Sequence, residues 1–265
     1  MTQAFPQTPD PVAWRDDVGS AVRSGPVGRV VSLVPSLTEA VALSAPGLLV
    51  GATDWCTHPA DLDVPRVGGT KNPRVDDVLA LAPDLVLANE EENRAVDLDA
   101  MRAAGLAVWV TAPRTLAGAF GSLGRMLAAC GAGAPDWLEE ARRAWSNTVD
   151  GSPPRARAVV PIWRRPWMVV GSDTFAGDVL LHLGVANLYA DHAARYPRVD
   201  LAQVDALDPD LVVLPDEPYP FSAADGPEAF PGRRVVLVSG RHLTWYGPSL
   251  VQARDLLERQ LAGLS

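Results

Sequence analysis

The sequence lacks the features that mark several common classes of protein. It contains only two cysteines among 265 residues, and no apolar run approaches the roughly 18 residues of a membrane span. A net charge of −9 with scattered arginines argues against the basic stripe that nucleic-acid binding needs. Residues 1–20 hold Asp10, Asp16 and Asp17 but no continuous apolar segment, so no secretory signal peptide is indicated. We therefore expect a cytoplasmic protein if Met1 is the native start, and a periplasmic or cell-surface one if the start lies upstream.

The usual signatures of catalysis are also missing. The chain has no Gly-x-Ser-x-Gly elbow, phosphate-binding loop, dinucleotide fingerprint or His-Glu-x-x-His helix. Residues 67–73 contain two glycines but lack the spacing of a phosphate loop. The content of 48% hydrophobic and 21% charged residues is ordinary for a folded globular chain. These observations predict a folded protein that is not an enzyme and requires no cofactor.

The most informative feature present is a repeat. Residues 73–76 and 197–200 both read Pro-Arg-Val-Asp, and each is followed by a short apolar helix, a Pro-Asp turn and a buried strand, at 83–87 and 209–214. Two copies are too few for a solenoid and favour two similar lobes, with a ligand in the cleft between them. The alternative is that this Pro-Asp pattern is only a common helix-to-strand connection of parallel sheets.

Strands and helices alternate in both halves of the chain. This alternation predicts an α/β fold of two Rossmann-like lobes with mostly parallel sheets, bridged by one long rigid helix starting near Pro135. Ser36 and Glu39 have the spacing of a helix-capping box, and Asn89 is expected to cap a helix that begins at Glu90. The expected domains are an extension over 1–28, a lobe over 29–132, the interlobe helix over 133–152 and a lobe over 153–265.

Large aromatic residues gather in the loops that follow the predicted strands. In parallel sheets ligands bind beyond the carboxyl ends of the strands, so rings in these loops can stack on a broad, apolar ligand. The alternative for any single ring is that it closes the end of the hydrophobic core. The candidate ligand-binding residues are Trp55, Cys56, His58, Trp163, Trp167, Tyr219, Phe221, His242, Trp245 and Tyr246.

Metal ligation is a separate question. Cys56 and His58 are one residue apart, so both could face one ion, and sulfur and imidazole donors suit zinc, iron or cobalt. A closed zinc site needs about four protein ligands, which this cluster does not supply. Cys56 and His58 are therefore the candidate metal ligands, with no complete site around them.

Several of these segments together carry a family resemblance. Residues 29–39 (Arg-Val-Val-Ser-Leu-Val-Pro-Ser-Leu-Thr-Glu), 67–69 and 81–87 resemble the periplasmic-binding-protein family for iron-siderophores, haem and vitamin B12, the helical-backbone metal receptors. Within that family the chain is most similar to members that bind vitamin B12. The resemblance implies a ligand-binding protein for a metal chelate: a cobalamin or other corrinoid first, haem or a ferric siderophore next. By analogy, the rings lining the cleft would be Trp55, Trp163, Trp167, Tyr219 and Trp245.

The resemblance also bears on partners. Family members that feed an importer carry an acidic residue on top of each lobe, which pairs with arginines of an ABC permease. Alignment of the repeat helices places Asp76 at this position in the first lobe but Ala202 in the second, with Asp200 close by. Transport is therefore less strongly implied than ligand binding, and a monomer is expected. The rival hypothesis is a cytoplasmic chelatase or metal or tetrapyrrole chaperone, with His58 or His242 and Glu217 as its reactive groups.

Overall fold

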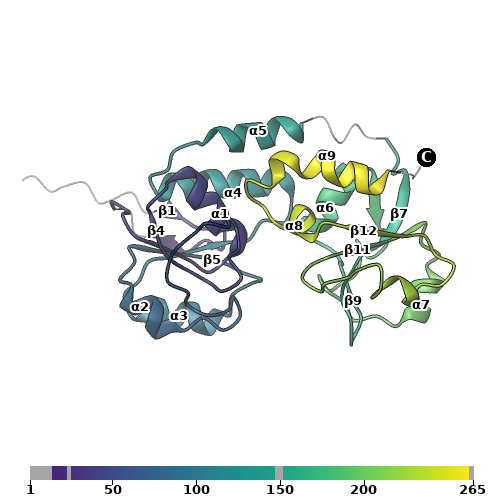
Figure 1. Cartoon of the computed structure of the whole chain (residues 1–265), viewed down its shortest axis with the longest axis horizontal. Coiled ribbons are helices and arrows are strands. Elements are labelled where there is room, and N and C mark those ends of the chain that lie inside the picture. Colours follow the sequence, from purple (N-terminus) through teal and green to yellow (C-terminus); the bar gives the residue numbers. More distant parts are fainter. Residues whose placement is uncertain (1–13, 23–24, 147–151, 263–265) are drawn as a thin grey trace, which may run out of the picture. The chain divides into compact units, whose positions relative to one another are not determined.

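The computed structural model describes residues 14–22, 25–146 and 152–262, and divides the chain into two compact units (Figure 1). The first unit contains the described residues up to 112 together with 125–133. The second contains 113–124 and the described residues from 134 onward. Over these described ranges, no helix is long and apolar enough to cross a membrane.

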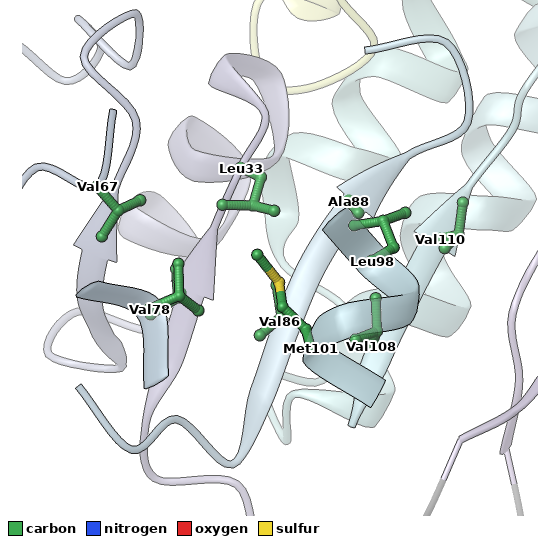
Figure 2. Close-up of a cluster of buried hydrophobic side chains, with 10 residues drawn as sticks. Leu33, Val67, Val78, Val86, Ala88, Leu98, Met101, Val108 and Val110 are labelled. Carbon is green, nitrogen blue, oxygen red and sulfur yellow. The ribbon is translucent and has the colours of Figure 1, made fainter. Parts of the chain in front are cut away.

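The first unit is built on a four-stranded sheet in which all neighbouring strands run parallel. The strand order is β4-β3-β5-β6, and the helices α1, α2 and α3 connect the strands. Figure 2 shows side chains of α3, such as Met101, against Val86 and Val108 of the sheet, where they form a buried apolar cluster. The elements are β3 (Val30–Ser32), α1 (Pro35–Ser44), β4 (Leu49–Ala52), α2 (Val75–Ala80), β5 (Leu85–Asn89), α3 (Ala95–Ala103) and β6 (Val108–Thr111).

The second unit repeats the same strand order. Its parallel sheet is β10-β7-β11-β12, so the strand that comes first along the chain again lies between the second and the third. This equivalence confirms the predicted α/β class with mostly parallel sheets. The elements are β7 (Ala156–Val159), the hairpin of β8 (Pro161–Trp163) and β9 (Met168–Val169), α6 (Phe175–His182), β10 (Val185–Asn187), α7 (Leu201–Ala206), β11 (Leu211–Pro215), the 3-10 helix η1 (Pro227–Ala229), β12 (Val235–Val238), α8 (Gly240–Thr244) and α9 (Leu250–Leu261).

The two Pro-Asp turns make the same contacts in the two units. The Oδ2 atom of Asp84 accepts from the backbone N–H of Arg29, just before β3, at 2.9 Å. In the second unit Oδ2 of Asp210 accepts from the N–H of Arg157 in β7 at 2.8 Å. Each arginine also donates to the carbonyl of the residue just before the proline of the turn, Ala82 in the first unit and Asp208 in the second. The sequence repeat is therefore a repeated tertiary contact and not only a common connection.

The helix predicted to bridge the lobes differs from the one that the two units share. Helix α5 (Asp136–Ala144) is shorter than expected and lies wholly in the second unit, where Nη1 of Arg254 on α9 donates to the carbonyl of Ala144 at 2.9 Å. Helix α4 (Leu116–Ala129) instead has residues 116–124 in the second unit and residues 125–129 in the first. The sequence after Pro135 predicted a helix correctly but carried no information about its packing partner. Residues 147–151 of the predicted helix lie outside the described residues.

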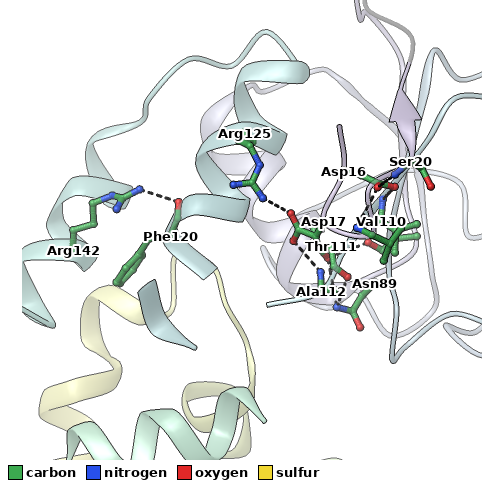
Figure 3. A network of polar contacts seen from close by, with 12 residues as sticks. Asp16, Asp17, Ser20, Asn89, Val110, Thr111, Ala112, Phe120, Arg125 and Arg142 are labelled. Carbon is green, nitrogen blue, oxygen red and sulfur yellow. Dashed lines mark hydrogen bonds and ion pairs between the residues drawn. The ribbon is translucent and has the colours of Figure 1, made fainter. Parts of the chain in front are cut away.

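The region predicted as an N-terminal extension contains a hairpin of β1 (Trp14–Arg15) and β2 (Ala21–Val22), which packs on the first unit. Asp16 is buried, and its carboxylate accepts from the backbone N–H groups of Ser20 at 2.7 Å and Val110 at 3.2 Å. Asp17 accepts from the N–H of Ala112 at 2.9 Å and forms an ion pair with Arg125 of α4 (Figure 3). The hairpin thus binds both the edge strand β6 and helix α4.

Two predicted helix starts are wrong. Helix α1 begins at Pro35 with Val34 as its N-cap, so Ser36 and Glu39 lie inside the helix and form no capping box. Proline at the first helical position determined this start, because its fixed φ suits the first turn. Residues after Asn89 form a turn, and α3 begins only at Ala95. The side chain of Asn89 nevertheless accepts from the N–H groups of Glu91 and Glu92 at 2.8 and 3.1 Å, so it caps that turn.

Candidate ligand-binding site

The loop after β4 presents one large ring to solvent. Trp55 is 67% exposed, which is far more than an indole that closes a core would be. Its ring lies beside Gly69, where a methyl group in place of the glycine hydrogen would come 3.5 Å from the indole nitrogen. Arg66 holds this loop in place, because its guanidinium donates to the carbonyls of Thr53 at 3.1 Å and Cys56 at 2.8 Å. An exposed ring on a braced loop is suited to stacking on a flat ligand.

The two candidate metal ligands on this loop point to different environments. Cys56 is fully buried, and Thr38 Oγ1 donates to its sulfur at 3.0 Å. The side chain of Cys56 is therefore turned toward α1 and has no accessible surface, and a ligand contact by Cys56 stays a prediction. His58 is half-buried, and its Nδ1 lies 3.1 Å from Thr57 Oγ1. Within the described parts of the chain, no group of three or more His, Cys, Asp or Glu side chains could hold a metal ion.

Burial makes the thiols of Cys56 and Cys130 poorly reactive. It raises the pKa of the Cys130 thiol to about 12 and also raises the pKa of Cys56. Since the thiolate is the reactive form, we expect neither cysteine of the native protein to react with a disulfide reagent at pH 8. Both should react once the chain is unfolded in guanidinium chloride, as read by the released chromophore. Rapid labelling of the Cys56 thiol in the folded protein would show that the loop carrying Cys56 opens.

In the second unit the structure brings four predicted rings into one cluster. The ring of Trp163 meets that of Tyr219 edge-on at 5.7 Å, and Tyr219 lies 4.6 Å from Phe221. Trp167 stacks on Phe221 with the ring centroids 6.0 Å apart. Phe221 is buried in the core cluster of this unit, and its predicted contact with a ligand stays a prediction. Trp163 is 43% exposed and Tyr219 is half-buried, and these two rings form the open side of the cluster.

A charged network underlies these rings. The guanidinium of Arg164 pairs with the carboxylate of Asp225 and lies 2.6 Å from that of Glu228. The phenol of Tyr219 donates to the other oxygen of Asp225 at 2.7 Å. The Arg164 side chain is only 16% exposed and stands over the ring of Trp167 at 5.4 Å. A largely covered guanidinium shared by two carboxylates holds the loop after β11 to the β8–β9 hairpin.

The last aromatic loop is partly helical. His242 lies in α8, and its Nδ1 is 2.8 Å from the hydroxyl oxygen of Ser239. Trp245 is half-buried beneath the guanidinium of Arg241, which lies 5.5 Å from the ring. Tyr246 is buried and packs edge-on against Phe175 at 5.8 Å, so it belongs to the core. Of these three predicted residues, His242 and Trp245 keep accessible surface.

Three residues that organise these loops were not predicted from the sequence. Arg66 and Arg164 brace loops through carbonyls or carboxylates, and Asp225 holds Tyr219. The position of Arg164 between Trp163 and Trp167 was the one available signal, because a cation beside two indoles often packs on a ring. Arg66 and Asp225 carry no comparable local signal.

A family comparison decides the class of the protein. The family model described as periplasmic binding protein matches residues 30–226, which include both parallel sheets up to β11. The chain belongs to this periplasmic binding protein family. It is therefore a solute-binding protein and not an enzyme, and the chelatase hypothesis is not favoured. The family's description supports a periplasmic location and gives no support to the expected cytoplasmic location.

Individual members of the periplasmic binding protein family extend the comparison. A vitamin B12-binding protein of Vibrio parahaemolyticus is 25% identical over 197 residues, which cover 71% of this chain and 70% of the relative. The crystal structure of the vitamin B12-binding protein of Vibrio cholerae has a TM-score of 0.73 at 20% identity, covering 90% of this chain and 98% of that one. A haem-binding protein of Pseudomonas aeruginosa has a TM-score of 0.70 at 25% identity, covering 88% and 91%.

Proposed function

We propose that this protein binds a metal chelate without altering it, with cobalamin or another corrinoid as the preferred ligand. Haem and ferric siderophores are the next candidates. The ligand contacts would come from the loops at the carboxyl ends of the parallel strands, with Trp55 in the first unit and Trp163, Tyr219 and Trp245 in the second.

The observation that carries the proposal is the exposure of two indole rings on braced loops. Trp55 is 67% and Trp163 43% exposed, although tryptophan is usually covered in a folded protein. Both loops are held by a guanidinium, from Arg66 in one and Arg164 in the other. Rings held in place lose little freedom on binding, which favours stacking on a broad polycyclic surface.

Charge distinguishes among the chelates. The chain carries a net charge of −9, which disfavours a strongly anionic siderophore and is neutral toward a corrinoid of little net charge. The name of the relative from Vibrio parahaemolyticus, a vitamin B12-binding protein, supports the corrinoid. The similarity to the haem-binding protein of Pseudomonas aeruginosa keeps haem as the second candidate.

The proposal also covers the subcellular location of the protein and its interaction with a permease. The family's description favours a periplasmic protein. Delivery of the ligand to an ABC permease remains the weaker part of the proposal. Asp76 is exposed at the second position of α2, where an acidic contact with a permease is expected, but Ala202 occupies the second position of α7. Cell fractionation tests the location. Recovery in the cytosol would contradict it.

The ligand is tested by titrating the full chain with cyanocobalamin, hemin, a ferric catecholate siderophore and Zn²⁺. Visible absorbance reports the chelates, and quenching of tryptophan fluorescence reports coverage of the rings. We expect saturable binding that is tightest for cyanocobalamin. Insertion of Fe²⁺ or Co²⁺ into a metal-free tetrapyrrole with multiple turnovers would contradict non-catalytic binding.

A further inference from the structure

We propose that Asp225 is a positioning residue that makes the site select a chelate whose metal is already fully coordinated. By holding the phenol of Tyr219 as a hydrogen-bond donor, Asp225 leaves an aromatic surface where a tyrosine could otherwise supply an oxygen ligand. This inference rests on the proposed binding of a metal chelate, and it assigns the cause of the preference for a corrinoid over haem.

The geometry fixes the phenol in one role. The Tyr219 hydroxyl lies 2.7 Å from Oδ2 of Asp225, and the other carboxylate oxygen, Oδ1, pairs with Arg164. Arg164 is in turn 2.6 Å from Glu228, and its side chain is 16% exposed. A short bond to a carboxylate that is itself held by a shielded guanidinium is a strong restraint on the hydroxyl.

The same hydrogen bond engages the proton that metal ligation would have to displace. Tyrosine ligates ferric iron as a phenolate, as in some haem proteins, and it must lose its proton to do so. In this protein the hydroxyl of Tyr219 is directed at Oδ2 of Asp225, which accepts its proton at 2.7 Å.

The same bond orients the ring. Tyr219 meets Trp163 edge-on, with the ring planes at 82° and the centroids 5.7 Å apart. Trp163 is the more exposed ring, and it packs against Tyr219, so the position of Tyr219 helps to fix the orientation of Trp163. Asp225 therefore favours stacking in two ways, through the fixed ring pair and through the hydroxyl that it holds.

Ligand selectivity tests the inference. Cyanocobalamin has both axial positions occupied, whereas ferric hemin accepts a ligand from the protein. For Asp225→Ala we expect cyanocobalamin affinity to fall by about tenfold, on the scale of one hydrogen bond to a charged group, while hemin affinity holds or rises. The hemin complex of this variant should gain ferric–phenolate absorbance, which a second change, Tyr219→Phe, removes. Asp225→Asn keeps an acceptor oxygen for the phenol and should largely restore the wild-type ratio of affinities.

Two further variants keep the test decisive. Asp210→Ala breaks another aspartate–arginine pair, at the start of β11, and should leave the affinity ratio unchanged. Tyr219→Phe should leave the visible spectrum of bound hemin unchanged even if Asp225→Ala fails to fold, and loss of a ferric–phenolate band there would overturn the inference because the wild-type phenol would be ligating iron. An unchanged ratio of cyanocobalamin to hemin affinity in folded Asp225→Ala overturns this inference but leaves the proposed function standing. Absence of wild-type binding to both ligands overturns the proposed function as well.

Discussion

Replacement of Trp55 by alanine is expected to weaken cyanocobalamin binding by about 1–3 kcal/mol, the scale of one well-covered aromatic contact. This corresponds to a rise in Kd of roughly 5- to 150-fold. Since the ring is 67% exposed in the free protein, the free energy of unfolding should change little. Fluorescence titration gives the affinity, and urea unfolding gives the stability.

The matched control is Trp137, a half-buried tryptophan on α5. Trp137→Ala removes an equal ring from a helix that carries no candidate ligand contact, so Kd should stay within about twofold of the wild-type value. If both variants bind alike, Trp55 does not touch the ligand. If Trp55→Ala lowers stability as much as affinity, the ring is structural.

The second large effect concerns Gly171, in the connection between β9 and α6. A methyl group at this position would lie 2.2 Å from the carbonyl oxygen of Ala194 and 2.9 Å from that of Arg195. The N–H of Gly171 also donates to the Arg195 carbonyl at 2.7 Å, so the two backbones cannot separate without losing this bond. We expect Gly171→Ala to lower the free energy of unfolding by about 3 kcal/mol, the upper range for overpacking.

Gly25 provides the comparison, because a methyl group there would meet no atom within 4 Å. Gly25→Ala should change the free energy of unfolding by less than about 1 kcal/mol, with the sign favouring stability. Equal unfolding midpoints in urea for the two variants would show that the segment around Ala194 moves freely. In that event the packing described for the second unit is not its solution packing.

The duplicated architecture was predictable from the sequence because its signal is local. Each Pro-Asp turn joins a short helix to a buried strand, and the aspartate repeats the same backbone contact in both units through Asp84 and Asp210. Turn chemistry and strand composition act over a few residues, so both can be recognised in the sequence without knowledge of the tertiary fold. The same reasoning located the loops that follow the strands.

The burial of individual side chains in those loops was not predictable. Cys56, Phe221 and Tyr246 were expected at a ligand site, but all three are buried. Aromatic residues in loops both cover core ends and bind ligands, and sequence alone gives no direction for the side chain. Trp55 and Trp163 differ from them only through the backbone path, which long-range contacts such as those of Arg66 determine.

Contacts between segments distant in sequence explain the remaining differences. The N-terminal hairpin reaches Val110 through Asp16, across 94 positions of the chain. Helix α5 is held by α9 through Trp145, whose indole nitrogen donates to the carbonyl of Leu250 at 2.9 Å. Neither pairing leaves a periodic or motif-like trace, so the first appeared as an extension and the second as a bridge between lobes.

Equilibrium dialysis of the full chain against cyanocobalamin tests the central claim most directly. We expect one bound ligand per chain at micromolar concentrations or below, unchanged cyanocobalamin recovered after unfolding, and weaker retention of hemin. No retention of cyanocobalamin, hemin or ferric siderophore at tens of micromolar, together with tight binding of free Zn²⁺ or Mn²⁺, would contradict it.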